Sequence, residues 1–374
     1  MVKRARAENG FDRSEEGFSL LELLVAVVIF SIVVLAIYAL LEVGRSERFT
    51  TVQKTESIQN VRIALNTIGR DAINAGVGYE NTGAQIPDNG LTLLNLAADA
   101  NNENDSLTPV VSGNNINMVN GTATDQLTFL FIDETFNSEV AAAAAAPSAA
   151  ESSFIHGHSL PINQLVDNGD EVWLNSPDGN GVTRVGDVYL IAGQTGWALG
   201  VLSKKSGANA LIFKNGDQLG VNRPTATSPI RNIFPPNSTA CGGNCIQVNA
   251  SASRVNWVTY RVVDEDGQGL GSGTLVRRAW GGPDGWTDSP LAFGVENLQV
   301  QYILANGDVS DDPVAGPDRI AGNADDDLNF LQTVRQVVVS VTVRGSEIDR
   351  RTNQPIRSTL TSRYSTRNLV YEKQ

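Results

Sequence analysis

Residues 18–41 form an almost uninterrupted apolar run near the amino terminus, and this run constrains the fold more than any other feature. A helix rising ~1.5 Å per residue would make the run roughly 36 Å long, enough to cross the hydrocarbon core of a bilayer with some tilt. Lys3, Arg4 and Arg6 precede it, which favours a cytoplasmic amino terminus. We therefore expect a transmembrane helix over 18–41, with the rest of the chain beyond the membrane.

One carboxylate, Glu22, lies inside this run. A charged side chain costs ~2.5–3.5 kcal/mol at the bilayer centre and less near its edge, so such a residue usually has a function. A cleavable signal peptide would have an apolar region of only ~7–15 residues and a small-residue cleavage site, and "LEVGRSERF" offers no convincing one. A plain signal anchor, with Glu22 reaching the interface from the helix end, is the simpler alternative.

The stretch "GFSLLELLVAVVIFSIVVLAIYAL" resembles the amino terminus of type IV prepilins and of the pseudopilins of type II secretion. In that family a polar leader ends in Gly, an aromatic residue follows, and a Glu comes four residues later. Gly17, Phe18 and Glu22 match these positions. The resemblance implies that a prepilin peptidase cuts between Gly17 and Phe18, removes the leader 1–17, and N-methylates the Phe18 amine.

The resemblance also gives Glu22 a partner. Cleavage would create an amine at Phe18 that is largely cationic at neutral pH. In a packed helical bundle, Glu22 of one subunit would neutralise the amine of a neighbour. Removing one partner of a buried charge pair costs ~3–5 kcal/mol, whereas the intact pair adds little net stability. We therefore expect the pair to select register among assembling subunits.

Residues 42–76 predict an amphipathic continuation of the same helix. Apolar residues recur at three- and four-residue spacing, which indicates a stripe that packs on the protein's own sheet. The stripe consists of Ile58, Val61, Leu65, Ile68 and Ala72. We expect a bend at Gly44, near the membrane exit, and the helix end at Gly76 or Gly78.

Residues 77–374 predict one large β-rich extracytoplasmic region, with one or two sheets and no clean linker. Its expected strands lie in "DQLTFLFID", "EVWLN", "GDVYLIAG", "WALGVLSK", "ALIFK", "GVENLQVQYIL", "RQVVVSVTVRG" and "STLTSRYSTRNL", with a hairpin in "NWVTYRVVDEDGQGLGSGTLVRRAW". Residues 83–124, rich in Asn, Asp, Gly and Thr, predict a loop. Alternate valines from Val337 to Val343 share one face, as in a sheet that packs on a helix.

The amphipathic segment and the large β region resemble PilW-type minor pilins, since major pilins are usually much shorter. The J-type minor pseudopilin of type II secretion is similar here and is the near alternative. The expected fold is the α+β type IV pilin-like fold, with a long N-terminal helix packed on a large antiparallel sheet. The resemblance implies other major and minor pilins and the inner-membrane pilus assembly platform as partners. The processed β domain would lie in the periplasm or on a cell-surface pilus.

Composition narrows the remaining functions. The formal net charge of −13 argues against binding nucleic acid through a general electrostatic field. The sequence shows no phosphate-binding glycine loop of the required form, and no serine of the apolar run has a partner that resembles a catalytic base. We therefore expect no enzymatic activity. A single-pass membrane-anchored enzyme or binding protein outside the cytoplasm is the alternative from another class.

Two short motifs carry cysteine and histidine. Cys241 and Cys245 in "CGGNC" predict a local disulfide outside the cytoplasm, with free thiols as the alternative. A zinc site would need two further ligands that do not lie nearby. His156 and His158 in "HGH" fit exposed loop histidines better than metal ligands, because no third ligand is evident.

The segment 306–330 concentrates aspartates among Gly and Asn. Hard oxygen ligands of this kind suit calcium, although no Glu closes an EF-hand loop. The candidate ligands are Asp308, Asp311, Asp312, Asp325, Asp326 and Asp327. A solvated acidic loop without metal is the default interpretation, and we expect no cofactor other than calcium.

Overall fold

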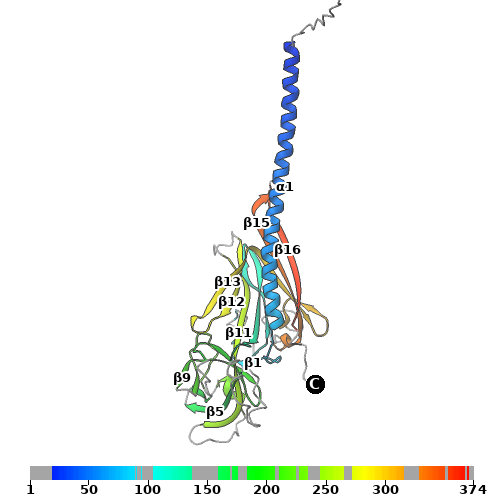
Figure 1. The fold of residues 1–374 in the computed structure, drawn as a ribbon. Helices are drawn as coiled ribbons and strands as arrows, with labels where there is room; N and C mark the ends of the chain where they lie inside the picture. Colours follow the sequence, from blue (N-terminus) through cyan, green and yellow to red (C-terminus); the bar gives the residue numbers. More distant parts are fainter. Residues whose placement is uncertain are drawn as a thin grey trace, which may run out of the picture.

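A long helix leads into a large β domain in the computed structural model (Figure 1). The structure describes residues 19–88, 90, 94, 104–136, 159–168, 171–175, 183–206, 210–224, 227–234, 245–264, 272–315, 328–349, 353–366 and 369. Its helices are α1 (Leu20–Asn74), α3 (Pro229–Asn232), η4 (Gly282–Asp284), η5 (Pro313–Ala315) and η6 (Leu328–Thr333). The expected α+β, pilin-like architecture is therefore confirmed.

Helix α1 runs as one element from the apolar run into the amphipathic segment, and it continues without interruption through Gly44. After Asn74, the backbone N–H of Ala75 still donates to the carbonyl of Asp71, at 2.9 Å. Gly76 then has φ of 80°, a left-handed conformation that glycine adopts at little cost. The predicted end of the helix at this glycine pair is confirmed.

The strands form two parts that we name by their distance from the helix. The helix-side part contains β3 (Val110–Val119), β4 (Thr122–Ile132), the second half of β11 (Cys245–Asp264), β12 (Gly273–Trp280), β13 (Trp286–Leu304), β14 (Val309–Ser310), β15 (Val334–Asp349) and β16 (Gln354–Ser365). The distal part contains β1 (Ala84–Ile86), β2 (Asp105–Leu107), β5 (Leu160–Asn168), β6 (Glu171–Asn175), β7 (Val188–Ala192), β8 (Trp197–Val201), β9 (Lys204–Ser206), β10 (Ala210–Lys214) and the first half of β11.

Strand β11 joins the two parts. Its first half pairs with β5 and β7, and its second half pairs with β4 and β12. Among the described strand pairs, only β1 and β8 run parallel. The apolar residues form two clusters that do not follow this division. The larger contains α1, the helix-side strands and residues of β1, β2, β7 and β8, whereas the smaller lies between β5, β10, α3 and other residues of β7 and β8. The two parts are therefore joined both by the backbone of β11 and by shared packing at β7 and β8.

The amphipathic half of α1 packs on the helix-side part. Val61, Leu65, Ile68 and Ala72 are buried in the same core as the alternate valines of β15, while Ile58 is half-buried. Arg62 and Arg70, which lie between them in sequence, are exposed. The predicted apolar stripe of the helix and the predicted valine face of the sheet are therefore both confirmed, and they pack on each other.

The prediction of a loop over residues 83–124 is wrong, because β1, β2, β3 and the start of β4 lie there. Strand β3 has little apolar alternation, and its pairing with β4 is interrupted by a bulge between Gly113 and Asn117. Asn120 and Gly121, with φ of 49° and 75°, form the two-residue turn between β3 and β4. Asn-Gly is a strong hairpin signal, and it was available in the sequence.

Glycine at position 69 lets the edge strand β16 approach the helix closely. A Cβ atom there would overlap the ring of Tyr364, and the Tyr364 hydroxyl donates to the carbonyl of Leu65 at 2.6 Å. The ring therefore cannot move away without breaking a hydrogen bond to the helix. This contact fixes the height of β16 along α1.

We expect Gly69→Ala to destabilise the protein by about 1–3 kcal/mol, because overpacking against Tyr364 outweighs the better helix propensity of alanine. Thermal unfolding of the full chain in detergent micelles measures the effect. Gly44→Ala is the matched control, since no atom lies within 4 Å of its added Cβ. A Gly69→Ala protein that is as stable as the Gly44→Ala protein would contradict the packing argument.

Candidate functional site

The first turn of α1 holds the acid of the apolar run in a defined position. Ser19 is the N-cap residue, and its Oγ accepts from the backbone N–H of Leu21 at 3.3 Å. Glu22 reaches back, so that its Oε2 accepts from the backbone N–H of Ser19 at 3.2 Å. This is a capping box, and a carboxylate at this end also complements the helix dipole. Glu22 therefore caps its own helix at Ser19, which is one residue after Phe18, the predicted new amino terminus.

Within the described residues, the apolar half of α1 is not buried against any other part of the chain. Leu20–Arg45 is long and apolar enough to cross a membrane, and none of its most apolar window is buried. In water such a surface would be strongly unfavourable, since each buried large apolar side chain gains about 1.5–3 kcal/mol. This exposed apolar surface is what a membrane-spanning helix presents to lipid.

A buried ion pair seats the other end of α1 on the sheet. Asp71 is on the packed side of the helix, and its side chain is only 4% exposed. The Tyr260 hydroxyl of β11 donates to Asp71 Oδ2 at 2.6 Å, and Arg277 Nε of β12 donates to the same oxygen at 2.7 Å. Two strands thus hold one helical carboxylate.

The electrostatics of this cluster follow from burial and from the pair itself. Burial, together with the negative charge of Asp71, raises the pKa of Tyr260, so the hydroxyl stays a donor. Burial alone lowers the pKa of Arg277, but the hydrogen bond and charge of Asp71 outweigh it and leave the pKa raised. Tyr260 and Arg277 therefore keep their protons near neutral pH, and both stay donors to Asp71.

A second charged cluster lies where the two halves of β11 meet. Arg254 Nη2 donates to Asp133 Oδ2 at 2.6 Å, and Arg254 Nη1 donates to Asp187 Oδ2 at 3.4 Å. The guanidinium also lies 5.3 Å from the ring centroid of Phe136. Partial burial raises the pKa of Asp133, but hydrogen bonds from Thr135 and Arg254 outweigh it and lower the pKa overall. The cluster ties the helix-side part to the distal part.

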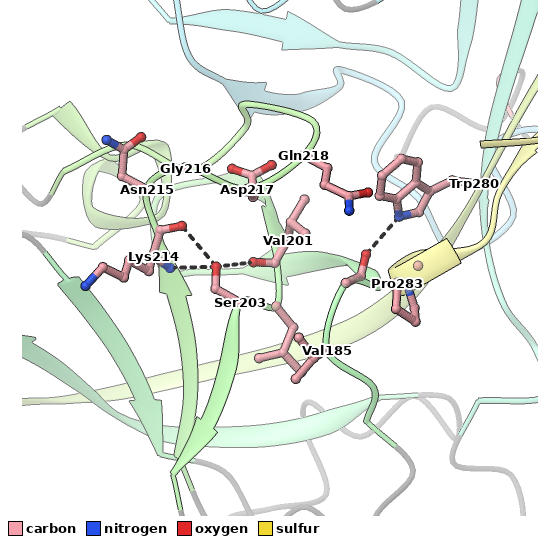
Figure 2. Close-up of a pocket in the computed structure, with 13 residues that line it drawn as sticks. Val185, Val201, Ser203, Lys214, Asn215, Gly216, Asp217, Gln218, Trp280 and Pro283 are labelled. Atoms are coloured by element: carbon pink, nitrogen blue, oxygen red, sulfur yellow. Dashed lines mark hydrogen bonds between the residues drawn. The ribbon is translucent and has the colours of Figure 1, made fainter. Parts of the chain in front are cut away.

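A pocket of about 390 Å³ opens nearby, between the end of β12 and the loops around β8 and β10 (Figure 2). Trp280 Nε1 donates to the Gly186 carbonyl across one side, at 2.8 Å. Asp217 accepts from three backbone N–H groups, and Ser203 exchanges hydrogen bonds with the backbone of Lys214. The carboxylate and hydroxyl in this pocket are thus engaged in holding its loops.

Several predicted site residues fall outside the described part of the chain. These are Gly17, Phe18, Cys241, His156, His158, Asp325, Asp326 and Asp327. Cleavage, methylation and the disulfide therefore stay predictions. Cys245 is described, and it is the first residue of β11, paired with Val166 of β5, rather than part of a loop.

The described aspartates of the candidate calcium segment lie near β14. Asp308 accepts from the side chain of Asn306 at 2.7 Å, and Asp311 accepts from that of Gln301 at 3.0 Å. Within the described ranges, no three His, Cys, Asp or Glu side chains come together in a way that could hold a metal ion. For Asp308, Asp311 and Asp312, the calcium prediction thus gains no support from geometry. For Asp325, Asp326 and Asp327, it is untested.

Comparison with known families finds one match. The model of the prokaryotic N-terminal methylation motif matches residues 12–38, which include the predicted cleavage bond and Glu22. Comparison with curated proteins and with solved structures gave no match. The chain therefore carries a type IV pilin-like prepilin signal on a membrane-anchoring helix. This signal implies processing by a prepilin peptidase and association with pilins.

We expect Asp71→Ala to lower the free energy of unfolding by roughly 3 kcal/mol, because it leaves Arg277 without its buried partner. Chemical unfolding of the full chain in micelles measures the loss. The matched control is Asp288→Ala, since Asp288 pairs with Arg261 and Arg278 at a more exposed site, where a loss of ~0–1 kcal/mol is expected. Equal losses in the two variants would show that Asp71 is not a special anchor.

Proposed function

We propose that the protein is a minor subunit of a type IV pilus, of the PilW type, that acts in a tip or initiation complex and has no enzymatic activity of its own. The observation that carries the proposal is the prepilin signal at residues 12–38 on a helix whose apolar half is entirely uncovered. Such a helix can be held by lipid before assembly and by the helices of other pilins afterwards.

The seat of α1 supports this function mechanically. The β domain contacts the helix through its amphipathic half, and Asp71 and the Tyr364 hydrogen bond both lie there. A pull on the apolar half is transmitted to the β domain through these contacts. A subunit drawn from the membrane into a filament needs this kind of rigid connection.

The size of the β domain favours a terminal position. The helix-side and distal parts, packed on two apolar clusters, extend away from a single helix (Figure 1). Filament subunits that repeat must stack closely along their helices, and this bulk obstructs close stacking. A tip or initiation complex with other minor subunits has no such requirement on its outer side.

Two other functions share part of these observations. A J-type minor pseudopilin of type II secretion would have the same signal and the same helix, and neighbouring pilus or secretion genes discriminate between the two. A membrane-anchored enzyme or binding protein is favoured by the pocket beside Trp280. That function requires no processing, so an uncut amino terminus would support it.

We expect the mature chain to begin at N-methylated Phe18. Mass spectrometry of the amino-terminal peptide, from protein purified out of a strain with active prepilin peptidase, measures this directly. Replacing Gly17 with Val should preserve the leader, because a side chain there obstructs approach of the backbone to the peptidase. Wild-type protein that retains residues 1–17 in such a strain would refute the proposed processing.

Glu22→Gln separates the two roles of the acid. Glutamine can still accept the Ser19 N–H, so it keeps the cap, but it cannot neutralise a neighbour's amine. If the charge pair directs assembly, Glu22→Gln should fail in piliation and in co-purification of other minor pilins as severely as Glu22→Ala. Glu47→Gln, at an exposed position of α1 beyond the span, should assemble normally. Normal assembly of Glu22→Gln would leave only the capping role.

A further inference from the structure

Strand β15 runs along α1 toward the membrane. Tyr364, which pairs with Val337 of β15, bonds the helix at Leu65. Farther along β15, a Cβ added to Gly345 would lie 3.3 Å from the Gln53 side chain. From the first contact to the second, the height on the helix moves from residue 65 to residue 53, which is toward the apolar span.

The β15–β16 hairpin continues beyond this second contact. Ile348 lies three residues after Gly345 and pairs with Pro355 of β16. Between the two contacts, eight residues of β15 correspond to twelve residues of α1, or about 1.5 helical residues per strand residue. The register shift between Arg344 and Ile348 reduces the further advance to about two to three strand residues. Ile348 therefore lies near the height of residue 50 of α1, about five residues from the end of the apolar span at Arg45. Figure 1 shows this end of the hairpin beside α1, where the helix leaves the β domain.

The hairpin end has a surface that suits a lipid interface. Ile348 is 53% exposed, although it lies in a paired strand. Arg45, Glu47 and Arg48 are exposed on α1 between this height and the end of the span. Arginine stems lie well on apolar surfaces while their guanidinium groups reach phosphates, so this composition is typical of the headgroup region.

We propose that the end of the β15–β16 hairpin is a second membrane contact, in which Ile348 enters the headgroup region of the leaflet that faces the β domain. The contact is continuous with the place where α1 leaves the bilayer, which is why lipid, and not another protein, is the occupant. The proposal rests on membrane insertion of α1, and it holds whether the subunit serves a pilus or a secretion filament.

This second contact would determine how the β domain stands on the membrane. A single helix leaves the domain free to tilt about the point where the helix emerges. The helix and the hairpin end would touch the membrane at two points. Tilting of the domain along the line that joins these points is then restricted. The contact must then be broken when the subunit leaves the bilayer for a filament.

Depth-dependent fluorescence quenching tests the proposal on the full chain in lipid nanodiscs. The label NBD is attached at Ile348→Cys in a Cys241→Ser, Cys245→Ser background, and the lipids include one with a spin-labelled headgroup. The matched control is Val309→Cys, an exposed valine (49%) on β14. Val309 pairs with Ile303, which lies opposite Gln336, so about ten ladder positions of β15, or roughly 33 Å, separate the two labels.

We expect several-fold stronger quenching at position 348 than at position 309. Equal, weak quenching at both positions would overturn the proposal. Quenching at 348 that appears only with two copies per nanodisc would overturn it as well, since a second subunit would then bring the label to the surface. A label at Ala36→Cys, quenched by acyl-chain spin labels, reports insertion of α1 separately, so failure of the anchor is distinguishable from failure of the contact.

A second measurement needs no cysteine replacement. Hydrogen exchange of the β15 amides after Gly345 is compared between wild type and Ile348→Asp, both in nanodiscs. Protection that is lost in Ile348→Asp, with unchanged exchange at the Val337 end of β15, supports the membrane contact. Identical exchange in the two proteins contradicts it.

Discussion

The carboxylate of Asp71 determines how the helix and the β domain are held together. Apolar packing is non-directional, so the stripe of α1 alone would allow small rotations and slides on the sheet. A buried carboxylate restricts these motions, because it must meet its donors Tyr260 and Arg277 with good geometry. The direction in which the uncovered span Leu20–Arg45 leaves the domain follows from this seat, and so does the height of the β15–β16 hairpin along the helix.

The parts of the fold that local periodicity specifies could be predicted from the sequence. The helical stripe through Leu65 and the alternate valines of β15 each predict one buried face, and in the structure these two faces pack together. Strands without such periodicity could not be recognised in this way. Strand β3 is polar and bulged, and β5 was not expected, because their places depend on pairing with β4 and β11 more than on their own residues. The smaller apolar cluster likewise depends on distant pairing, since β7 and β8 contribute residues to both clusters.

The residues of the candidate site also differ in whether nearby sequence reveals them. Glu22 stands out because an acid inside an apolar run is costly, and its cap is also readable, since Ser19 and Glu22 have the spacing of a capping box. Asp71 gave a weaker signal, as an acid three residues after Ile68, on the edge of the apolar stripe. Its partners Tyr260 and Arg277 lie on strands far away in the sequence, and only the sheet order brings them to the helix.

The capping bond of Glu22 lowers the cost of a carboxylate inside a bilayer and still leaves the carboxylate able to bind a neighbouring subunit. The Ser19 N–H satisfies one acceptor position of the carboxylate within the same chain, which reduces the cost of holding it in apolar surroundings. A carboxylate has about four acceptor positions, so the cap leaves room for a cationic amine from a neighbour. The cap and the bond to the neighbour's amine are both charge-assisted and use different acceptor positions, so the amine would add to the cap without displacing it. In the proposed assembly, the cap directs the acid toward the helix end, and the incoming amine selects the register.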